Sequence, residues 1–452
     1  MRLTSTPYLW NFFLGTVLLV GLDTRPIYAA EQKVSSSQSP EWQQTVGALL
    51  KSNLWSARDI YDASHVLMVP LHYAFITQDQ IAISQFETMF TRFANAELPG
   101  GQLNQVHWMY LVSRYLSLKT EFKVPFSDAD QSLLQRSIAH LRYRWELAPD
   151  FQWGSFPFFG LKARLEYVLD EPSSIDLLRE RSYYRAVTDY ELFVLAIGND
   201  LGFVYNNRPD IAESDRKLAV EVFHYTYRIL EKRVTSTKSN GMLFQVGYWR
   251  DHPDYQFAGH LTLGKDLGPS KKADVAEDSG HSHRWPLWLE SFRFGAVTVA
   301  QFDAIEVLQQ RLSHQLKNSV FYVTENGVLL RNYLDGSNGI YRYGYGTTGS
   351  NELNGYGPYM LSGSLGEGWY CFAPNMSQEY RYYRDSYPLN QALLDLYVGP
   401  NTNRKRNPLL VWPDFFTNGF AEVVAEQCSF VAETYPQRKE KVEIWKRFVS
   451  RR

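Results

Sequence analysis

The side chains best suited to acid–base chemistry gather between residues 248 and 288. Residues 248–255 read Tyr-Trp-Arg-Asp-His-Pro-Asp-Tyr, Gly259-His260 follows, and residues 276–288 read Ala-Glu-Asp-Ser-Gly-His-Ser-His-Arg-Trp-Pro-Leu-Trp. Imidazoles and phenols transfer protons, carboxylates act as acids, bases or nucleophiles, and guanidinium groups bind carboxylates. The segment therefore predicts a catalytic cluster of His281, His283, Arg284, Tyr255, His252, Asp278 and Glu277. Its neighbours predict substrate contacts by Trp249, Arg250, Asp254, His260 and Trp285.

Pro286 indicates where this cluster lies relative to the next helix. Proline suits the first position of a helix and disfavours helical geometry at the residue before it, here Trp285. The acids, histidines and Arg284 are then expected in the loop that leads into the helix, where the helix N-terminus favours an anionic group. The simpler alternative is that these polar side chains cap helices and bridge loops.

Helices are the elements expected to position the cluster. Apolar residues at i, i+3 and i+4 predict them over residues 42–55, 62–75, 80–94, 102–118, 128–147, 160–169, 184–200, 212–234, 286–294, 300–321, 358–372, 388–398 and 420–447. Ser127-Asp-Ala-Asp is a strong helix start, with a capping residue followed by acids in the first turn. No repeated motif accompanies the helices, so the pattern predicts an all-α fold rather than a tight solenoid.

Two long segments interrupt the helical pattern, residues 239–285 and 336–368. The second contains ten of the 29 glycines and the alternating run Tyr341-Arg-Tyr343-Gly-Tyr345, which would place three tyrosines on one face of a short strand. Long irregular segments in a compact domain usually shape a site. We therefore expect the two segments to line one cleft, with Tyr341, Tyr343, Tyr345 and Asn351 among the substrate contacts.

The composition points to carbohydrate rather than nucleic acid. A net charge of −2 gives no electrostatic reason for a nucleic acid partner. The chain has 12 Trp, 30 Tyr and 27 Phe, and rings with a polar edge suit stacking on sugars. Core filling alone would account for the Phe but less well for the Tyr, because each buried hydroxyl needs a partner.

Helix pairs in series, interrupted by aromatic and Gly-rich loops, resemble the α/α toroids of carbohydrate-active enzymes, which include alginate and hyaluronate/chondroitin lyases and six-hairpin glycosidases. The resemblance is architectural and covers about residues 40–398. It implies a single α/α-toroid domain over residues 31–452, with a few short β segments in loops, acting on a polysaccharide or oligosaccharide. The Asn-Asn-His-Ser-Tyr run of alginate lyases and the C-terminal β-sandwich of many larger members have no counterpart here.

The first 30 residues are expected to be a secretion signal. Met-Arg is followed by an apolar run over residues 9–22, too short to span a bilayer comfortably, and by small residues at Ala29 and Ala30. The protein is then secreted or periplasmic, and the alternative is a membrane anchor at residues 9–22. Cys371 and Cys428 could pair in an oxidising compartment, or could equally be two buried thiols.

Three reactions fit the cluster. In a uronate lyase a cation neutralises the sugar carboxylate, a His or Tyr removes the C5 proton, and a Tyr protonates the leaving oxygen. In a glycosidase two carboxylates act as acid and as base or nucleophile, with Glu277, Asp278, Asp251 and Asp254 available. We expect no cofactor, although His281-x-His283 with Asp254 or Asp278 leaves a divalent metal site open.

Elimination is the leading expectation, hydrolysis follows, and a non-catalytic glycan-binding envelope protein is the alternative outside enzymes. Asp62, His65 and His72 are weaker candidates, because a helical histidine is more often a satisfied core residue and Pro70 would kink their shared helix. The basic run Arg404-Lys-Arg406 is expected in a solvated loop.

Overall fold

The computed structural model describes residues 36–53, 56–149, 158–170, 182–208, 212–270, 272–346, 348, 354–400 and 406–434. The expected signal segment, Asn351 and the end of the last predicted helix lie outside these residues. In the part of the chain that is described, no helix combines the length and the apolar character needed to cross a membrane.

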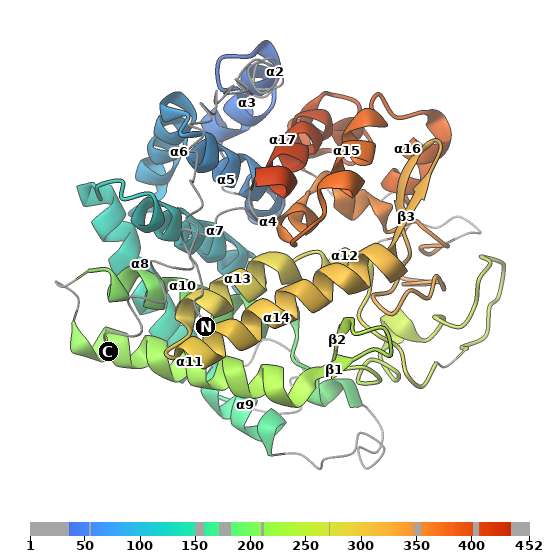
Figure 1. The fold of residues 1–452 in the computed structure, drawn as a ribbon, viewed down its shortest axis with the longest axis horizontal. Helices are drawn as coiled ribbons and strands as arrows, with labels where there is room; N and C mark the ends of the chain where they lie inside the picture. The colour runs from blue at the N-terminus through green and yellow to red at the C-terminus, as the bar shows by residue number, and fades with distance from the viewer. Residues whose placement is uncertain are drawn as a thin grey trace, which may run out of the picture.

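Helices dominate the described chain, which confirms the predicted all-α class (Figure 1). The helices are α2 (Pro40–Gln44), α3 (Val46–Lys51), α4 (Ala57–Val66), α5 (Met68–Thr77), α6 (Gln80–Phe93), α7 (Gln102–Glu121), α8 (Asp128–Glu146), α9 (Leu161–Leu169), α10 (Asp189–Asn206), α11 (Glu213–Arg233), α12 (Ser279–Ser282), α13 (Trp285–Gly295), α14 (Val299–Gln315), α15 (Ser377–Asp385), α16 (Gln391–Val398) and α17 (Phe420–Thr434).

Local sequence explains where several helices begin. The Ser127 side chain accepts a hydrogen bond from the Asp130 amide while Asp130 bonds back to Ser127, which forms the capping box of α8. Helix α13 begins at Trp285, one residue earlier than expected, with Pro286 in its first turn. The helix expected over residues 62–75 is broken at Leu67, because the ring of Pro70 crowds the carbonyl four residues earlier, that of Val66.

Other predicted elements are corrected. The helix expected over 358–372 is replaced by two short 3₁₀ turns, η5 (Ser362–Gly366) and η6 (Trp369–Phe372), separated by Gly368 in the left-handed conformation (φ 78°). Helix α14 ends at Gln315, and a π-helical turn, η4 (Leu316–Val320), leads into a hairpin of β3 (Phe321–Thr324) and β4 (Gly327–Leu330). A second antiparallel pair joins β1 (Val234–Ser236) to β2 (Met242–Phe244).

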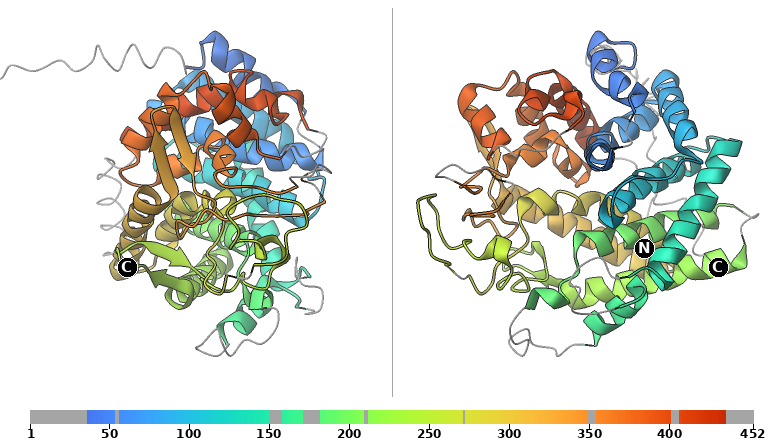
Figure 2. Two further views of the ribbon diagram at one scale, coloured as in Figure 1. Left: turned by 90° about the vertical axis from the view of Figure 1, so that its right-hand side faces the viewer. Right: turned by 180° about the vertical axis from the view of Figure 1, so that it is seen from behind.

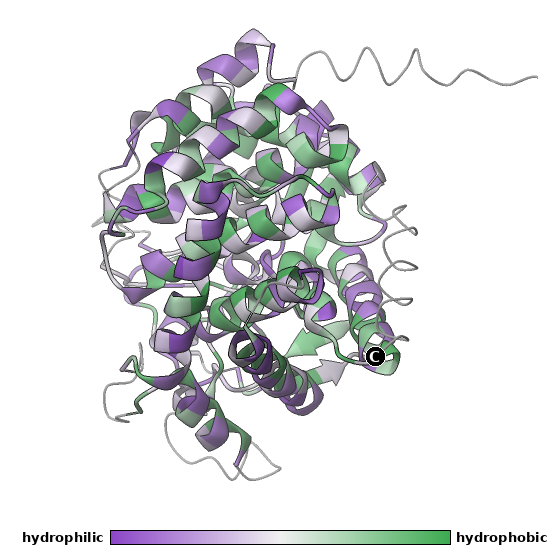
Figure 3. Ribbon diagram, turned by 90° about the vertical axis from the view of Figure 1, so that its left-hand side faces the viewer, coloured by the Kyte–Doolittle hydropathy of each residue, from purple (hydrophilic) through white to green (hydrophobic). Residues whose placement is uncertain are grey.

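The inner helices, which are not consecutive in the chain, pack side by side around the core. Helix α4 packs on α7, α7 on α10, and α10 on α13, while α13 contacts η6, η6 contacts α17, and α17 contacts α5. Helices α8, α11 and α14 lie outside this series (Figures 1 and 2). Hydrophilic and hydrophobic residues alternate along the helix ribbons (Figure 3). Each of these three helices buries a separate set of its residues, such as Leu133, Leu134 and Leu141 of α8, as expected for amphipathic helices that cover a core.

A buried charge network ties the inner helices together. Arg114 of α7 donates to Asp200 of α10 at 2.8 Å and to Glu290 of α13 at 2.7 Å, and all three side chains are almost fully buried. Its second terminal nitrogen also lies 3.2 Å from Nε2 of His72 in α5. One guanidinium therefore links four helices, α5, α7, α10 and α13.

Candidate functional site

The two irregular segments meet, and one cleft is lined by the second segment and by the end of the first, residues 278–284. Residues 239–275 and 336–368 run beside each other (Figure 2, left), joined by backbone hydrogen bonds such as Ile340 N to His260 O at 2.9 Å. The cleft has a volume of about 180 Å³. Its charged lining comprises Arg58, Asp62, Asp278, His281, Arg284, Arg342, Glu367 and Arg406. Its rings are Tyr61, Tyr341, Tyr356, Tyr397, Trp412 and Phe415.

His281 and Asp278 form a dyad at the cleft wall. Asp278 caps α12 by accepting a hydrogen bond from the His281 amide at 3.1 Å. The same carboxylate lies 2.8 Å and 3.0 Å from Nδ1 of His281, so this nitrogen carries a proton directed at Asp278. The Nε2 atom has no hydrogen-bond partner among the described residues, and the side chain is 27% exposed to the cleft. The imidazole is therefore held in one tautomer with its lone pair available.

The electrostatics of the dyad follow from this contact. Burial lowers the pKa of His281, but the charge and hydrogen bond of Asp278 outweigh burial, so the pKa is raised above 6.5. Burial raises the pKa of Asp278, but His281 and the Tyr255 hydroxyl, which donates at 2.7 Å, bring it well below its usual value. Asp278 is thus an ionised orienting group.

A small aromatic cluster supports Asp278 from behind. It comprises Ala186, Trp249, Tyr255, Ala258, Val275, Tyr333, Tyr341 and Leu361, all buried. Tyr255 stacks on Trp249 with ring centroids 5.4 Å apart and an interplanar angle of 13°. Within this cluster Tyr255 fixes the Asp278 carboxylate, while Tyr341 and Leu361 also line the cleft.

Arg342 presents a cation to the cleft from an unusual backbone conformation. Its φ of 51° is in the left-handed region, and its amide and Nε both bond to Asp254, at 3.0 Å and 2.7 Å. The terminal nitrogens make no hydrogen bond to any described residue, and the side chain is 26% exposed. Asp254 therefore holds the guanidinium so that its outer edge can bind an anion.

A phenol lies beside a second, more buried guanidinium. Arg284 donates to Asp189 at 2.9 Å, to the Tyr61 hydroxyl at 2.8 Å and to Nε2 of His65 at 3.1 Å. Since the Tyr61 oxygen accepts from Arg284, its own proton is free to point into the cleft. Arg58, one turn earlier on α4, pairs with Asp62 at 2.7 Å and lies over the Tyr61 ring.

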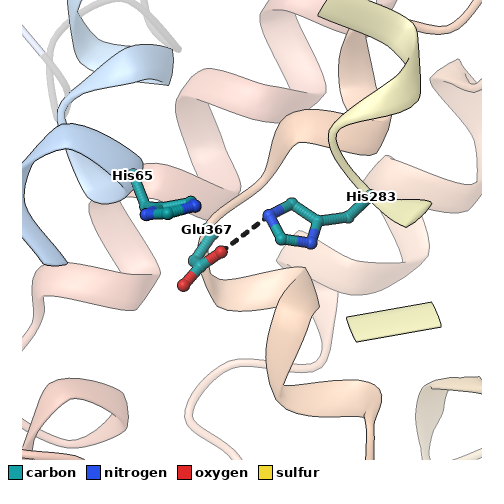
Figure 4. Close-up of side chains that lie close together, drawn as sticks. All are labelled: His65, His283 and Glu367. Atoms are coloured by element: carbon teal, nitrogen blue, oxygen red, sulfur yellow. Dashed lines mark ion pairs between the residues drawn. The ribbon is translucent and has the colours of Figure 1, made fainter. Parts of the chain in front are cut away.

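Two imidazoles and a carboxylate form a group deeper in the wall. Nε2 of His283 lies 2.7 Å from Glu367 Oε2, and His65 lies close by (Figure 4). Burial raises the pKa of Glu367, but His65, His283 and Arg284 bring it below its usual value. Burial lowers the pKa of His65 to about 3, so this imidazole is neutral at pH 7.

Of the predicted site residues, His281, Asp278, Arg284 and Tyr341 line the cleft, and His283 contacts Glu367, which also lines it. Other predicted contacts are wrong in position, because their side chains are buried or turned elsewhere. Trp285 is fully buried and donates to Glu277 at 2.7 Å, so neither reaches the cleft. The same holds for Trp249, Arg250, His252, Asp254, Tyr255, His260, Tyr343 and Tyr345, which do not line the cleft.

The expected tyrosine strand is also wrong. Residues 341–345 form no strand, because Arg342 and Gly344 have φ values of 51° and 67°, which break the alternation. Tyr341 alone makes an isolated bridge, to Tyr356. Tyr343 turns away and donates to the Gly264 carbonyl at 2.8 Å.

The divalent metal site that the sequence left open at His281 and His283 does not form, because the two imidazoles do not share a site. Their partners differ, Asp278 for the first and Glu367 for the second. In the described ranges, the one group of His, Cys, Asp and Glu close enough to share an ion is His65, His283 and Glu367.

Cys371 and Cys428 are buried thiols that form no disulfide.

Tyr61, Arg58, Arg342 and Glu367 were missed from the sequence. Arg342 and Glu367 lie inside the segment that was expected to shape the site, which is the only signal that could have found them.

Comparisons with family models, curated proteins and solved structures find no match for this chain.

Proposed function

We propose that this protein is a polysaccharide lyase that cleaves a uronic-acid-containing glycan by β-elimination. The observation that carries the proposal is the Asp278–His281 dyad, whose free Nε2 faces a cleft lined by guanidinium groups and aromatic rings. A neutral, oriented imidazole is the usual general base for removing a carbon-bound proton next to a carboxylate.

The first step is proton removal. Arg342 and Arg58, which both line the cleft, bind the uronate carboxylate. Neutralising the charge of this carboxylate acidifies the neighbouring C5–H. Nε2 of His281 takes the C5 proton. The electron pair left on C5 forms the C4–C5 double bond.

The second step is loss of the leaving group. As the double bond forms, the bond from C4 to the glycosidic oxygen breaks, and that oxygen takes a proton from the Tyr61 hydroxyl. Arg284 donates to the same hydroxyl at 2.8 Å and stabilises the phenolate that results. Tyr356 and Trp412, which are partly exposed, supply ring faces on which sugar residues can stack.

The arrangement of helices supports the α/α toroid that the sequence resembles. The contacts pass from α5 and α4 to α7, α10, α13, η6 and α17, and then return to α5. A circuit of this kind, with α8, α11 and α14 outside it, is how paired helices close a toroid. Cleft-lining loops at one end of the inner helices suit a polymer that lies across them.

The test is incubation of the purified protein with alginate, hyaluronate, chondroitin and polygalacturonate. Absorbance of the unsaturated product and the number of reducing ends should rise together on the true substrate. His281→Ala should lower the rate by about 10²–10⁴-fold, while His260→Ala, a histidine outside the cleft, should leave the rate unchanged. Reducing ends without new absorbance would contradict elimination, and neither signal would favour a glycan-binding role.

Hydrolysis is the second candidate, because the cleft also holds two carboxyl groups whose pKa values are shifted in opposite directions. Burial raises the pKa of Asp62 despite Arg58 and Arg406, whereas the pKa of Glu367 is lowered. An acid and an ionised partner are what a glycosidase needs. If this is the reaction, Asp62→Asn abolishes reducing-end formation and His281→Ala does not.

A further inference from the structure

The group formed by His65, His283 and Glu367 has the donor set of a metal site. The residues come from three separate elements, namely α4, the residue after α12 and the residue after η5. One donor atom from each lies within 4.8 Å of the other two. Figure 4 shows the two rings and the carboxylate turned toward one another.

Both imidazoles are held in the orientation that metal ligands adopt. Nδ1 of His65 lies 2.9 Å from the Tyr61 carbonyl, and Nδ1 of His283 lies 2.9 Å from the Gly280 carbonyl. Each Nδ1 therefore carries the proton and donates it to the backbone. This fixes the tautomer that leaves the Nε2 lone pair available, as in metal-ligating histidines.

The contact between His283 and Glu367 needs a cation. With its proton on Nδ1, His283 faces the carboxylate with a lone pair at 2.7 Å. Two acceptors at this distance require a proton or a metal ion to be shared. His283 is buried, and its Nε2 makes no aligned hydrogen bond to any described residue. The geometry thus suits an ion that both atoms contact from different directions better than a proton on the line between them.

Arg284 is the competitor for one ligand position. Its Nε donates to Nε2 of His65 at 3.1 Å, and an ion bound there must displace that single hydrogen bond. The contacts to Asp189 and Tyr61 can remain, so the guanidinium keeps its charge partner. His72 on α5 makes the same pair of contacts, to a backbone carbonyl and to Arg114, but has no second histidine or carboxylate in such a group among the described residues.

We propose that His65 Nε2, His283 Nε2 and the Glu367 carboxylate bind one divalent transition metal ion, with Zn²⁺ the best match. Two imidazoles and one carboxylate are a common zinc donor set, and three protein ligands leave a fourth position open. Glu367 and His281 both line the cleft, so the ion would lie at the wall of the same cleft. The site does not depend on which reaction the cleft catalyses.

The test is metal binding by the full chain after treatment with a chelator. Calorimetric titration with Zn²⁺ should give one equivalent bound, and Co²⁺ should give the visible absorption of a four-coordinate site. Glu367→Gln and His283→Gln, which keep side-chain size, should lose the tight equivalent and the absorption. His260→Gln, a partly exposed histidine elsewhere, should retain both.

Thermal unfolding separates loss of the site from loss of the fold. Zn²⁺ should raise the melting temperature of the chelator-treated wild type and of His260→Gln, but not that of Glu367→Gln. Absence of stoichiometric binding at micromolar Zn²⁺ in the wild type, or an unchanged equivalent in both ligand variants, would overturn the proposal. Because no glycan is present, failure of the lyase assay would leave this result unaffected.

Discussion

His281 can act as a base only when it is neutral, and Asp278 controls when that happens. The aspartate raises the pKa of His281 above 6.5, against the effects of burial and of Arg284 and Arg342. If His281 is the base, kcat/KM should rise with pH through a value above 6.5. The proposed elimination should therefore be fastest at neutral to alkaline pH.

Asp278→Asn tests this coupling. Without the carboxylate, burial and the two arginines lower the pKa of His281, so the acid limb of the kcat/KM profile should move to lower pH. The plateau should fall by about 10²–10⁴-fold because the ring is no longer polarised. Tyr255→Phe removes one hydrogen bond from Asp278 without removing its charge, and should shift the limb much less. An unmoved limb in Asp278→Asn would show that His281 is not the titrating base.

Glu277 should make folding stability depend on pH. Burial raises its pKa to about 7, more than the Trp285 hydrogen bond lowers it. The carboxyl ionises at lower pH in the unfolded chain than in the folded protein. The free energy of unfolding is therefore highest below about pH 4.5 and falls by about 3 kcal/mol as the pH rises to about 7. Glu277→Gln cannot ionise and should lack this decline. Chemical denaturation from pH 4 to pH 8 measures the difference, and parallel curves for the two proteins would contradict the prediction.

What the sequence revealed at this scale was local. Asp278 and His281 are three residues apart before a helix, so their contact could be predicted from spacing alone. Tyr61, Arg342 and Glu367 join them from positions far away in the chain. Their roles depend on tertiary packing, which the segment containing Arg342 and Glu367 could indicate only in general terms.

At the scale of elements, Arg114 is expected to hold α7, α10 and α13 together. Arg114→Met leaves Asp200 and Glu290 buried without their cation, which should cost about 3–5 kcal/mol of unfolding free energy. Lys162→Met removes a partly exposed ion pair with Glu221 and should cost less than about 1 kcal/mol. Denaturant titration compares the two variants, and equal losses would show that the buried network contributes no more than a surface pair.

The helices were the most predictable elements, because the 3.6-residue pattern of α6, α8 and α11 records the face that each buries. The errors lie where another preference competes. Gly368 divides the helix predicted over 358–372. The helix predicted over 300–321 ends at Gln315, and a π-helical turn leads into the hairpin that begins at Phe321. Short apolar runs fit either period, so packing decides between them.

At the scale of the whole molecule, a cleft rich in arginine on a chain of net charge −2 should concentrate anionic polymers locally. Four guanidinium groups line it, from Arg58, Arg284, Arg342 and Arg406. Arg406 ends a basic run that was expected in a solvated loop, and instead lies 3.4 Å from Asp62 at the cleft. The charge that matters for recognition is therefore its distribution over one surface, which composition does not reveal.

Export is the remaining prediction for the whole chain. The proposed polysaccharide substrate would require export of the protein, and the apolar run at residues 9–22 followed by Ala29-Ala30 predicts cleavage there. The native protein should therefore begin near Ala30 or Glu31. The described fold starts at Ser36, and its first side-chain contacts join Ser37 to Asp79, so a chain starting at Glu31 retains every contact reported above.

N-terminal sequencing of protein purified from the extracellular or periplasmic fraction measures the outcome. Recovery of the intact Met1 terminus from a membrane fraction would show instead that the segment anchors the enzyme, and the chain starting at Glu31 should then be active but no longer sediment with membranes.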